Sequence, residues 1–337
     1  MPLKKPLKPY PFDKYGYSEI RVIDDTDTAC EGDDAFAIAQ LLLTSKLDVR
    51  AINAANFLHL EDSAQQSYDA IVKLVDAMGL TGEVKINHGS LPMKSETEYE
   101  TSEASDFIIE EAMRDDPRPL FVVSQGAITN IAIALKEKPE IAKRMHCIWI
   151  GGQTYPEGGW EFNLSNDVIA ARVVMNSEMG LWQVPANVYS MMRISFGELY
   201  ENLYDCGKAG RYLCEQLWDC NKRMQDMFNG GPNALGGVTG DDGGLLTQQM
   251  ANRPIEFYAT FSSGDMWQLG DSPVAGLLLN CQPYDREIIG APYINDDSTY
   301  TLRPDNPRKI AVYKTIDSGF IFKDFFFKMR YQYGENS

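Results

Sequence analysis

The chain has 337 residues, of which 44% are hydrophobic, and a formal net charge of −17 at pH 7. This is enough to build a sizeable core, as one large α/β domain or two ordinary ones. The negative charge argues against nucleic-acid polymers and anionic membrane surfaces, because both reward clusters of Lys and Arg. A small neutral substrate or a cation is the expected partner.

The sequence contains no run of about eighteen apolar residues, and the segment 1–17 lacks the apolar centre of a secretory signal. We therefore expect no membrane span and a cytoplasmic location. The six cysteines show no CxxC spacing, which predicts reduced thiols rather than a disulfide framework or a zinc site.

Strand-like and helix-like segments alternate along the first part of the chain. Short β-branched runs predict strands at 19–24, 49–56, 84–87, 120–126, 147–152 and 181–189. Helical periodicity falls between them at 35–43, 63–79 and 104–116, and Gly79 is the expected C-cap of the second helix. This alternation predicts an α/β fold, with a mostly parallel central sheet covered by helices on both faces.

The alternation is lost at about 198–262, where a helical pattern leads into a glycine-rich loop. We interpret this segment as a mainly helical insertion near the active end of a single domain that comprises residues 1–337. A helix at 272–280, a strand at 308–317 and a helix at 319–330 are expected after it.

An acidic stretch follows the first predicted strand, with five aspartates and one glutamate between Asp24 and Asp34. Carboxylates this dense repel one another unless they share a positive charge, which a divalent cation supplies. Oxygen ligands without histidine favour Ca²⁺ or Mg²⁺ over zinc. A helix N-terminus alone would account for one acidic residue, at Asp33 or Asp34, but not for the others. Cys30, a soft ligand, is expected to be a small buried side chain.

The segment 25–39, DTDTACEGDDAFAIA, resembles the N-terminal signature of the inosine-uridine preferring nucleoside hydrolase family. Four further segments are similar to motifs of that family, in the family's order. They are AAN at 54–56, GAITNIAIAL at 126–135, GG at 151–152 with EFN at 161–163, and GDSPVAG at 270–276. Any one of these matches is weak, but five in the right order are specific.

The resemblance implies Ca²⁺-dependent hydrolysis of the N-glycosidic bond of ribonucleosides, which yields free base and ribose in purine or pyrimidine salvage. It implies a Ca²⁺ site made by Asp27, Asp34, the backbone carbonyl of Thr129, and Asp271. It assigns the binding of sugar hydroxyls to Asp33, Asn56, Glu161 and Asn163, for three of which (Asn56, Glu161 and Asn163) loop capping is the plain structural alternative. Asp27 would act as general base toward a water whose pKa the cation lowers. Homodimers or homotetramers are implied as well.

The sequence departs from the family pattern in two places that bear on chemistry. Five residues separate Asp27 from Asp33, where three are usual, and Gly270 stands where many members have a histidine that protonates the leaving base. Trp267 and Trp160 are candidates to stack on the base instead, although either could be ordinary packing. The three histidines and Asp265 are weaker candidates for the acid, and the base preference cannot be copied from the family.

Two alternative functions fit parts of the sequence. IDDTDTA at 23–29 also fits a haloacid-dehalogenase-like phosphohydrolase with Mg²⁺, in which Asp25 is the nucleophile and Asp27 the acid or base. The order of the later motifs disagrees with that family. A metal-dependent nucleoside or sugar binder without catalysis is the second alternative, motivated by the missing histidine.

Overall fold

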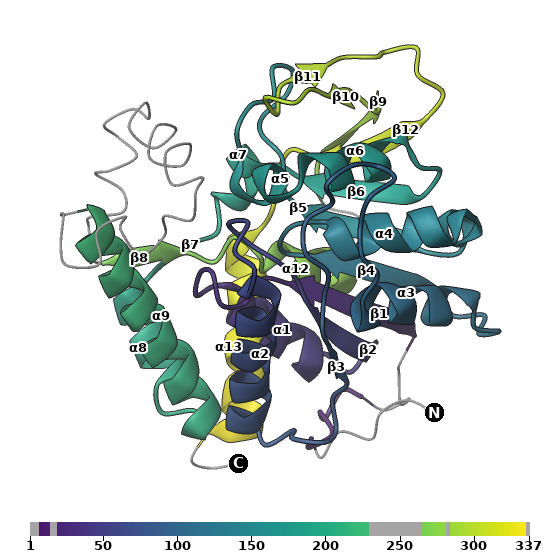
Figure 1. Ribbon diagram of the computed structural model, residues 1–337. Helices are drawn as coiled ribbons and strands as arrows, with labels where there is room; N and C mark the ends of the chain where they lie inside the picture. The colour runs from purple at the N-terminus through teal and green to yellow at the C-terminus, as the bar shows by residue number, and fades with distance from the viewer. Residues whose placement is uncertain (1–6, 14–18, 229–264, 281–283, 335–337) are drawn as a thin grey trace.

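The computed structural model describes residues 7–13, 19–228, 265–280 and 284–334 (Figure 1). Its centre is an eight-stranded sheet with the strand order β3-β2-β1-β4-β5-β6-β12-β9. All neighbouring strands run parallel except β9, which is antiparallel to β12. The predicted mostly parallel α/β sheet is therefore confirmed. The strands are β1 (Ile20–Thr26), β2 (Leu47–Ala54), β3 (Ile86–Asn87), β4 (Leu120–Ser124), β5 (His146–Ile150), β6 (Gly180–Val184), β9 (Arg286–Gly290) and β12 (Lys309–Tyr313).

Helices cover both faces of this sheet, because successive strand residues point to opposite sides. Val22 and Ile148 belong to one hydrophobic core, and their neighbours Ile23 and Trp149 belong to the other. The first core also contains residues of α1 (Asp34–Leu43), α2 (Ser63–Ala77), α8 (Phe196–Leu203), α9 (Gly207–Phe228), α12 (Pro273–Leu279) and α13 (Ser318–Tyr333). The second contains residues of α3 (Glu103–Met113), α4 (Thr129–Glu137), the 3₁₀ helix η1 (Pro139–Lys143) and α6 (Val168–Asn176).

Short elements complete the structure at the carboxyl ends of the strands and beside the sheet. They are α5 (Phe162–Asn166), α7 (Ala186–Tyr189) and two small antiparallel pairs, β7 (Arg193–Ser195) with β8 (Met266–Gln268) and β10 (Tyr293–Ile294) with β11 (Tyr300–Thr301). Among the described residues, no helix combines the length and the apolar character that crossing a membrane would require.

Two segments differ from the sequence-based expectation. The strand expected at 181–189 ends at Val184, because Pro185 has no backbone N–H for the ladder and instead precedes the short helix α7. β9 was not predicted, since it is an edge strand whose first three residues are exposed and carry no alternating pattern. Gly79, the predicted C-cap, follows the end of α2 in the left-handed conformation, with φ of +68°.

The predicted helical insertion begins with α8 and α9, and its remainder, residues 229–262, lies outside the described residues, as does Cys281. α9 contacts the acidic loop directly. The Gln216 side chain donates a hydrogen bond to the Gly32 carbonyl at 2.6 Å. A Cβ atom at Gly32 would lie 2.6 Å from Leu217 Cδ1, so a larger residue there would displace the Leu217 side chain.

A buried ionic network ties α3 to the first two strands. Glu111 on α3 is fully buried and accepts hydrogen bonds from Arg21 of β1, Arg50 of β2 and Arg114. The Arg21 guanidinium is itself only 3% exposed and also binds the Glu111 backbone carbonyl at 2.7 Å. Nearby arginines hold the pKa of Glu111 below its ordinary value, against the effect of burial. The Glu111 carboxylate, which binds all three arginines, is thus the centre of this network.

Replacing that carboxylate should destabilise the fold strongly. Glu111→Ala leaves the buried Arg21 charge with only the Asp116 carboxylate, 3.8 Å away, which we expect to lower the free energy of unfolding by about 3–5 kcal/mol. Glu110→Ala is the matched control, because the neighbouring Glu110 pairs with Arg114 from an exposed position and should cost less than about 1 kcal/mol. Urea unfolding of the two variants measures the difference. Equal stabilities would contradict the assigned role of Glu111.

Candidate functional site

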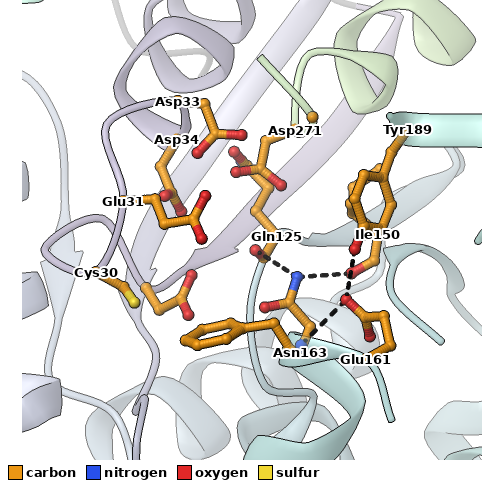
Figure 2. Close-up of a pocket in the computed structure, with 13 residues that line it drawn as sticks. Cys30, Glu31, Asp33, Asp34, Gln125, Ile150, Glu161, Asn163, Tyr189 and Asp271 are labelled. Carbon is orange, nitrogen blue, oxygen red and sulfur yellow. Dashed lines mark hydrogen bonds between the residues drawn. The ribbon is translucent and has the colours of Figure 1, made fainter. Parts of the chain in front are cut away.

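A pocket with an open volume of about 370 Å³ lies at the carboxyl ends of the parallel strands (Figure 2). Ligands of open parallel sheets bind at this edge, where strands lead into loops and helices. The lining residues come from the β1–α1 loop, the end of β4, β5, α5, α7 and the loop before α12. They are Asp27, Cys30, Glu31, Asp33, Asp34, Gln125, Ile150, Glu161, Phe162, Asn163, Tyr189, Gly270 and Asp271.

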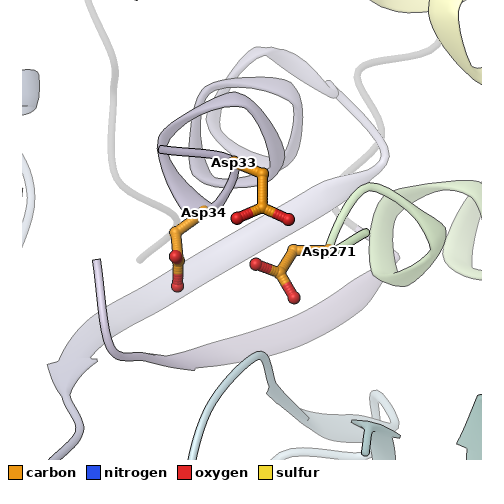
Figure 3. A group of neighbouring side chains, drawn as sticks. All are labelled: Asp33, Asp34 and Asp271. Atoms are coloured by element: carbon orange, nitrogen blue, oxygen red, sulfur yellow. The ribbon is translucent and has the colours of Figure 1, made fainter. Parts of the chain in front are cut away.

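Carboxylates from distant parts of the chain meet in this pocket. One oxygen from each of Asp33, Asp34 and Asp271 lies within 4.8 Å of the other two (Figure 3). Asp33 and Asp34 are placed by the start of α1, and Asp271 by the loop that leads into α12. Asp27 lines the same pocket, and its Oδ2 is buried without a hydrogen-bond partner among the described residues.

The electrostatics of this cluster are those of buried like charges. Burial raises the pKa of Asp27, Asp34 and Asp271 well above the ordinary aspartate value, and neighbouring carboxylates raise it further. The same causes raise the pKa of Glu31 to about 8, and burial raises that of Asp33 to about 6. A shared divalent cation would relieve both costs, and the oxygen donors suit a hard cation.

Cys30 does not change this assignment. It lines the pocket, but burial and the nearby carboxylate of Asp27 raise the pKa of its thiol well above the ordinary value. Sulfur is a soft donor, whereas the carboxylate oxygens around it suit a hard cation, so the thiol is a poor ligand for such a cation. The donor set of the pocket is therefore one of oxygen atoms.

Two further aspartates of the acidic stretch lie beneath the pocket and do not line it. Asp24 accepts a hydrogen bond from the Gln125 side chain, and Asp25 accepts one from Asn130 at 3.0 Å. Both side chains are fully buried, and burial raises their pKa to about 8 and about 7. A phosphohydrolase would need Asp25 as a nucleophile facing its substrate, so this geometry argues against that alternative.

Glu161 and Asn163 form another wall of the pocket, at the start of α5. Glu161 is the N-cap of α5, and its carboxylate accepts hydrogen bonds from the backbone of Asn163 and Leu164. The Asn163 side-chain amide donates to the carbonyls of Gln125 at 3.1 Å and Ile150 at 2.9 Å. Both amide hydrogens are thus used, which leaves the Asn163 Oδ1 atom for a ligand.

Thr129 and Asn56, by contrast, lie outside the pocket lining. The Asn56 amide donates to the Ser90 carbonyl at 3.0 Å and to the Thr129 hydroxyl at 2.9 Å. The Thr129 hydroxyl in turn donates to Asp167 at 2.8 Å. These residues form a buried polar chain that supports the site from behind. Between β4 and α4, the segment that carries Thr129, it is Gln125 that lines the pocket together with the carboxylates.

The aromatic and acid candidates are also placed elsewhere. Trp267 lies in β8, is 5% exposed and packs in the hydrophobic core. Trp160 packs edge-on against Phe162, with ring centroids 6.4 Å apart, and Phe162 is the one of the pair that lines the pocket. The pocket lining includes neither Asp265 nor any of the three histidines, which are all among the described residues. They are His59, which is exposed, His88, which stacks on Tyr68, and His146, which stacks on Phe121.

Sequence reasoning missed four contributors to the pocket: Gln125, Phe162, Tyr189 and the thiol of Cys30. Gln125 and Phe162 stand next to residues of recognised motifs, so a search of motif neighbours at strand ends would have found them. Tyr189 lay in a segment predicted as a strand. The strand instead ends before Pro185, and Tyr189 reaches the pocket as the last residue of α7.

The family model for the inosine-uridine preferring nucleoside hydrolases matches residues 22–282, well over half of the chain. The chain belongs to this family. Family membership confirms the predicted resemblance, and the motifs on which that resemblance rested lie within the matched residues.

Relatives of the family are similar to the chain at low identity. The inosine-uridine preferring nucleoside hydrolase of Crithidia fasciculata is 30% identical over 116 residues, which are 33% of this chain and 36% of that protein. The non-specific ribonucleoside hydrolase RihC of Salmonella paratyphi B is 26% identical over 207 residues, 53% of this chain and 64% of that protein. The chain thus spans less than two thirds of the length of these curated relatives.

Solved structures of nucleoside hydrolases share the fold over most of the chain. A plant nucleoside hydrolase, PpNRh1, superposes with a TM-score of 0.64 at 17% identity, covering 92% of this chain and 98% of the other. A purine-preferring ribonucleoside hydrolase from Gardnerella vaginalis gives a TM-score of 0.68 at 18% identity, with the same coverage.

The buried carboxylates predict an unusual pH dependence of stability. Groups whose pKa is raised in the folded state keep protons that the unfolded chain releases, so stability is greatest below their unfolded pKa and falls as pH rises. With Asp33 at about 6, Asp25 at about 7 and Glu31 at about 8, the metal-free protein should lose stability from about pH 5 to pH 8. Urea unfolding at several pH values in chelator measures this fall, and millimolar Ca²⁺ should reduce it.

Asp33→Asn should stabilise the metal-free protein at pH 8, because it removes one of the repelling charges. Asp297→Asn is the matched control, since Asp297 is exposed and hydrogen-bonded to Thr299 outside the pocket, and should leave the pH dependence unchanged. A stability that stays level with pH in chelator, or an Asp33 variant no different from the control, would contradict the cluster's electrostatics.

Proposed function

We propose that the chain hydrolyses the N-glycosidic bond of ribonucleosides and releases the free base and ribose. The observation that carries this proposal is the convergence of Asp27, Asp33, Asp34 and Asp271 on one pocket, in a chain that belongs to the nucleoside hydrolase family. The pocket combines several polar groups with two aromatic side chains, Phe162 and Tyr189, as small-molecule sites commonly do.

We propose Ca²⁺ as the cation of the site, held by Asp27, Asp34 and Asp271. The backbone carbonyl that completes the set is better supplied by Gln125 than by Thr129, because Gln125 lines the pocket beside these carboxylates. Ca²⁺ accepts mixed carboxylate and carbonyl ligands. When bound, such a cation supplies positive charge that offsets the repulsion of the carboxylates and makes a nearby water more acidic.

Asp27 is the proposed general base. Its buried Oδ2 has no partner among the described residues, so it is an acceptor for the proton of the attacking water. The water oxygen bonds to the anomeric carbon of the sugar, the bond to the base nitrogen breaks, and its electron pair leaves with the base. Positive charge develops on the sugar during this step, and the surrounding carboxylates stabilise it.

The sugar contacts follow from which polar atoms remain available. Asp33 and the Asn163 Oδ1 atom face the pocket and can accept hydrogen bonds from sugar hydroxyls. Phe162, rather than Trp160 or Trp267, is the aromatic side chain that we propose contacts the base, because it lines the pocket. Asn56 and Thr129 then support the site through the polar chain behind it.

The reaction fits a role in nucleoside salvage in the cytoplasm, and we expect a homodimer or homotetramer. Size-exclusion chromatography with light scattering determines the oligomeric state, and a monomer would contradict the expected homodimer or homotetramer.

The function is tested by incubating the purified protein with inosine, uridine and p-nitrophenyl riboside, with and without chelator. We expect free ribose from at least one substrate, loss of the activity in chelator and its return with Ca²⁺. Release of phosphate from a phosphate ester would favour the phosphohydrolase instead. Tight nucleoside binding without turnover would favour the non-catalytic binder.

Asp27→Asn should lower kcat by at least about a hundredfold, because a positioned general base typically contributes that much or more. Gly126→Ala should also impair turnover, since a Cβ atom there would lie 2.8 Å from the Asp27 carboxyl carbon and displace that side chain. Gly197→Ala is the control, because its Cβ would meet nothing closer than 3.9 Å. The base assignment is wrong if Asp27→Asn keeps more than about a hundredth of kcat.

A further inference from the structure

Glu161 has no acceptor position left for a ligand. Its carboxylate is 2% exposed and accepts four hydrogen bonds, as many as its lone-pair sites. Oε2 accepts from the backbone N–H groups of Gly152 at 2.6 Å and Leu164 at 2.9 Å. Oε1 accepts from the Asn163 backbone at 3.2 Å and from the Tyr189 hydroxyl at 2.9 Å. A sugar hydroxyl could bind Glu161 only by displacing one of them.

Tyr189 lines the pocket beside Glu161 and is hydrogen-bonded to it. Its hydroxyl lies at the end of α7 and donates to Glu161, on the side of the pocket away from Glu31 and Asp34 (Figure 2). Burial and the Glu161 charge raise the pKa of this phenol well above its ordinary value, so it keeps the proton that it donates. A phenolic oxygen that donates still carries acceptor lone pairs. Tyr189 can therefore receive a hydroxyl where Glu161 cannot.

Gly270 provides the room that this arrangement needs. A Cβ atom at Gly270 would lie 3.1 Å from Tyr189 Cδ2 and 3.4 Å from Asp33 Oδ2, so even a methyl group would crowd the ring. A larger side chain at this position would have to move Tyr189. The absence of a side chain at Gly270 thus leaves room for the Tyr189 ring, although the two residues are far apart in sequence.

We propose that the Tyr189 hydroxyl, rather than Glu161, is the direct acceptor for one sugar hydroxyl of the substrate. Glu161 then acts as a positioning residue that fixes the orientation of the phenol. The sugar hydroxyl donates to Tyr189, and Tyr189 donates to Glu161, in a relay of two hydrogen bonds. This inference rests on the proposed function, because it names a substrate contact of the same site.

The test combines Tyr189→Phe with substrates that lack single hydroxyls. The kcat/KM of the wild type and the variant is measured on a ribonucleoside and on its 2′-, 3′- and 5′-deoxy analogues. We expect the variant to lose about fivefold to thirtyfold on the parent and on two analogues, as for one lost hydrogen bond, and to match the wild type on the third. That third analogue identifies the hydroxyl that Tyr189 binds.

Two controls separate this contact from general damage to the fold. Tyr155→Phe removes a comparable hydrogen bond, from the Tyr155 hydroxyl to Gln183 at 2.8 Å, outside the pocket lining, and should leave the ratios between substrates unchanged. Gly270→Ala should shift the Tyr189 ring and reproduce the substrate pattern of Tyr189→Phe in weaker form. Equal losses on all four substrates, or a variant as active as the wild type, would overturn the inference.

Ribose binding distinguishes failure of the contact from failure of the proposed function. Calorimetric titration of ribose into the Ca²⁺-loaded protein should show weaker binding to Tyr189→Phe than to the wild type. Ribose binding that depends on Tyr189, without turnover of any nucleoside, would refute the proposed hydrolysis but support the contact between Tyr189 and the sugar. Turnover with ratios unaffected by Tyr189→Phe overturns the contact alone. A wild type that neither turns over nucleosides nor binds ribose overturns both.

Discussion

Repulsion among buried carboxylates is the constraint on which the rest of this site depends. The fold brings Asp27, Asp33, Asp34 and Asp271 into one pocket and shields them from water, which raises the pKa of each. A fold would not retain such a cluster for stability, since apolar residues would cost less. The polar chain from Asn56 through Thr129 to Asp167 lies outside the pocket lining, and its members are hydrogen-bonded to one another.

Much of the fold could be predicted from the sequence, because period and strand alternation are local signals. The strands that β-branched runs mark, such as 120–126 and 147–152, were found within two residues of their observed ends. β9 could not be predicted, because an exposed edge strand carries no buried face to impose a pattern. α7 was missed because apolar residues continue past Pro185, although the strand itself ends at Val184 and the next residues form a short helix.

Several residues that line the pocket could be named from the sequence, but their contacts could not. Carboxylates crowded after a strand indicate a cation site whatever the conformation of the loop between them. Asp27, Asp33 and Asp34 could therefore be named from the sequence. Which atoms of Glu161 and Asn163 remain available is a property of their partners, and those partners lie on β4, β5 and α7. The spacing of residues along the sequence does not show which of these donors and acceptors are already paired. The same holds for the close approach of Tyr189, the last residue of α7, to Gly270 in the loop before α12.

The position of Asp271 has a consequence for how the protein matures. Asp27 and Asp34 leave the ribosome early, but the carboxylate that faces them belongs to the loop before α12, which packs on α1 and α13 only when most of the chain has been made. A nascent chain that ends before residue 271 therefore carries the early aspartates without the carboxylate that completes the cluster. The complete cluster, and the packing of α12 on α1, become available only late in synthesis.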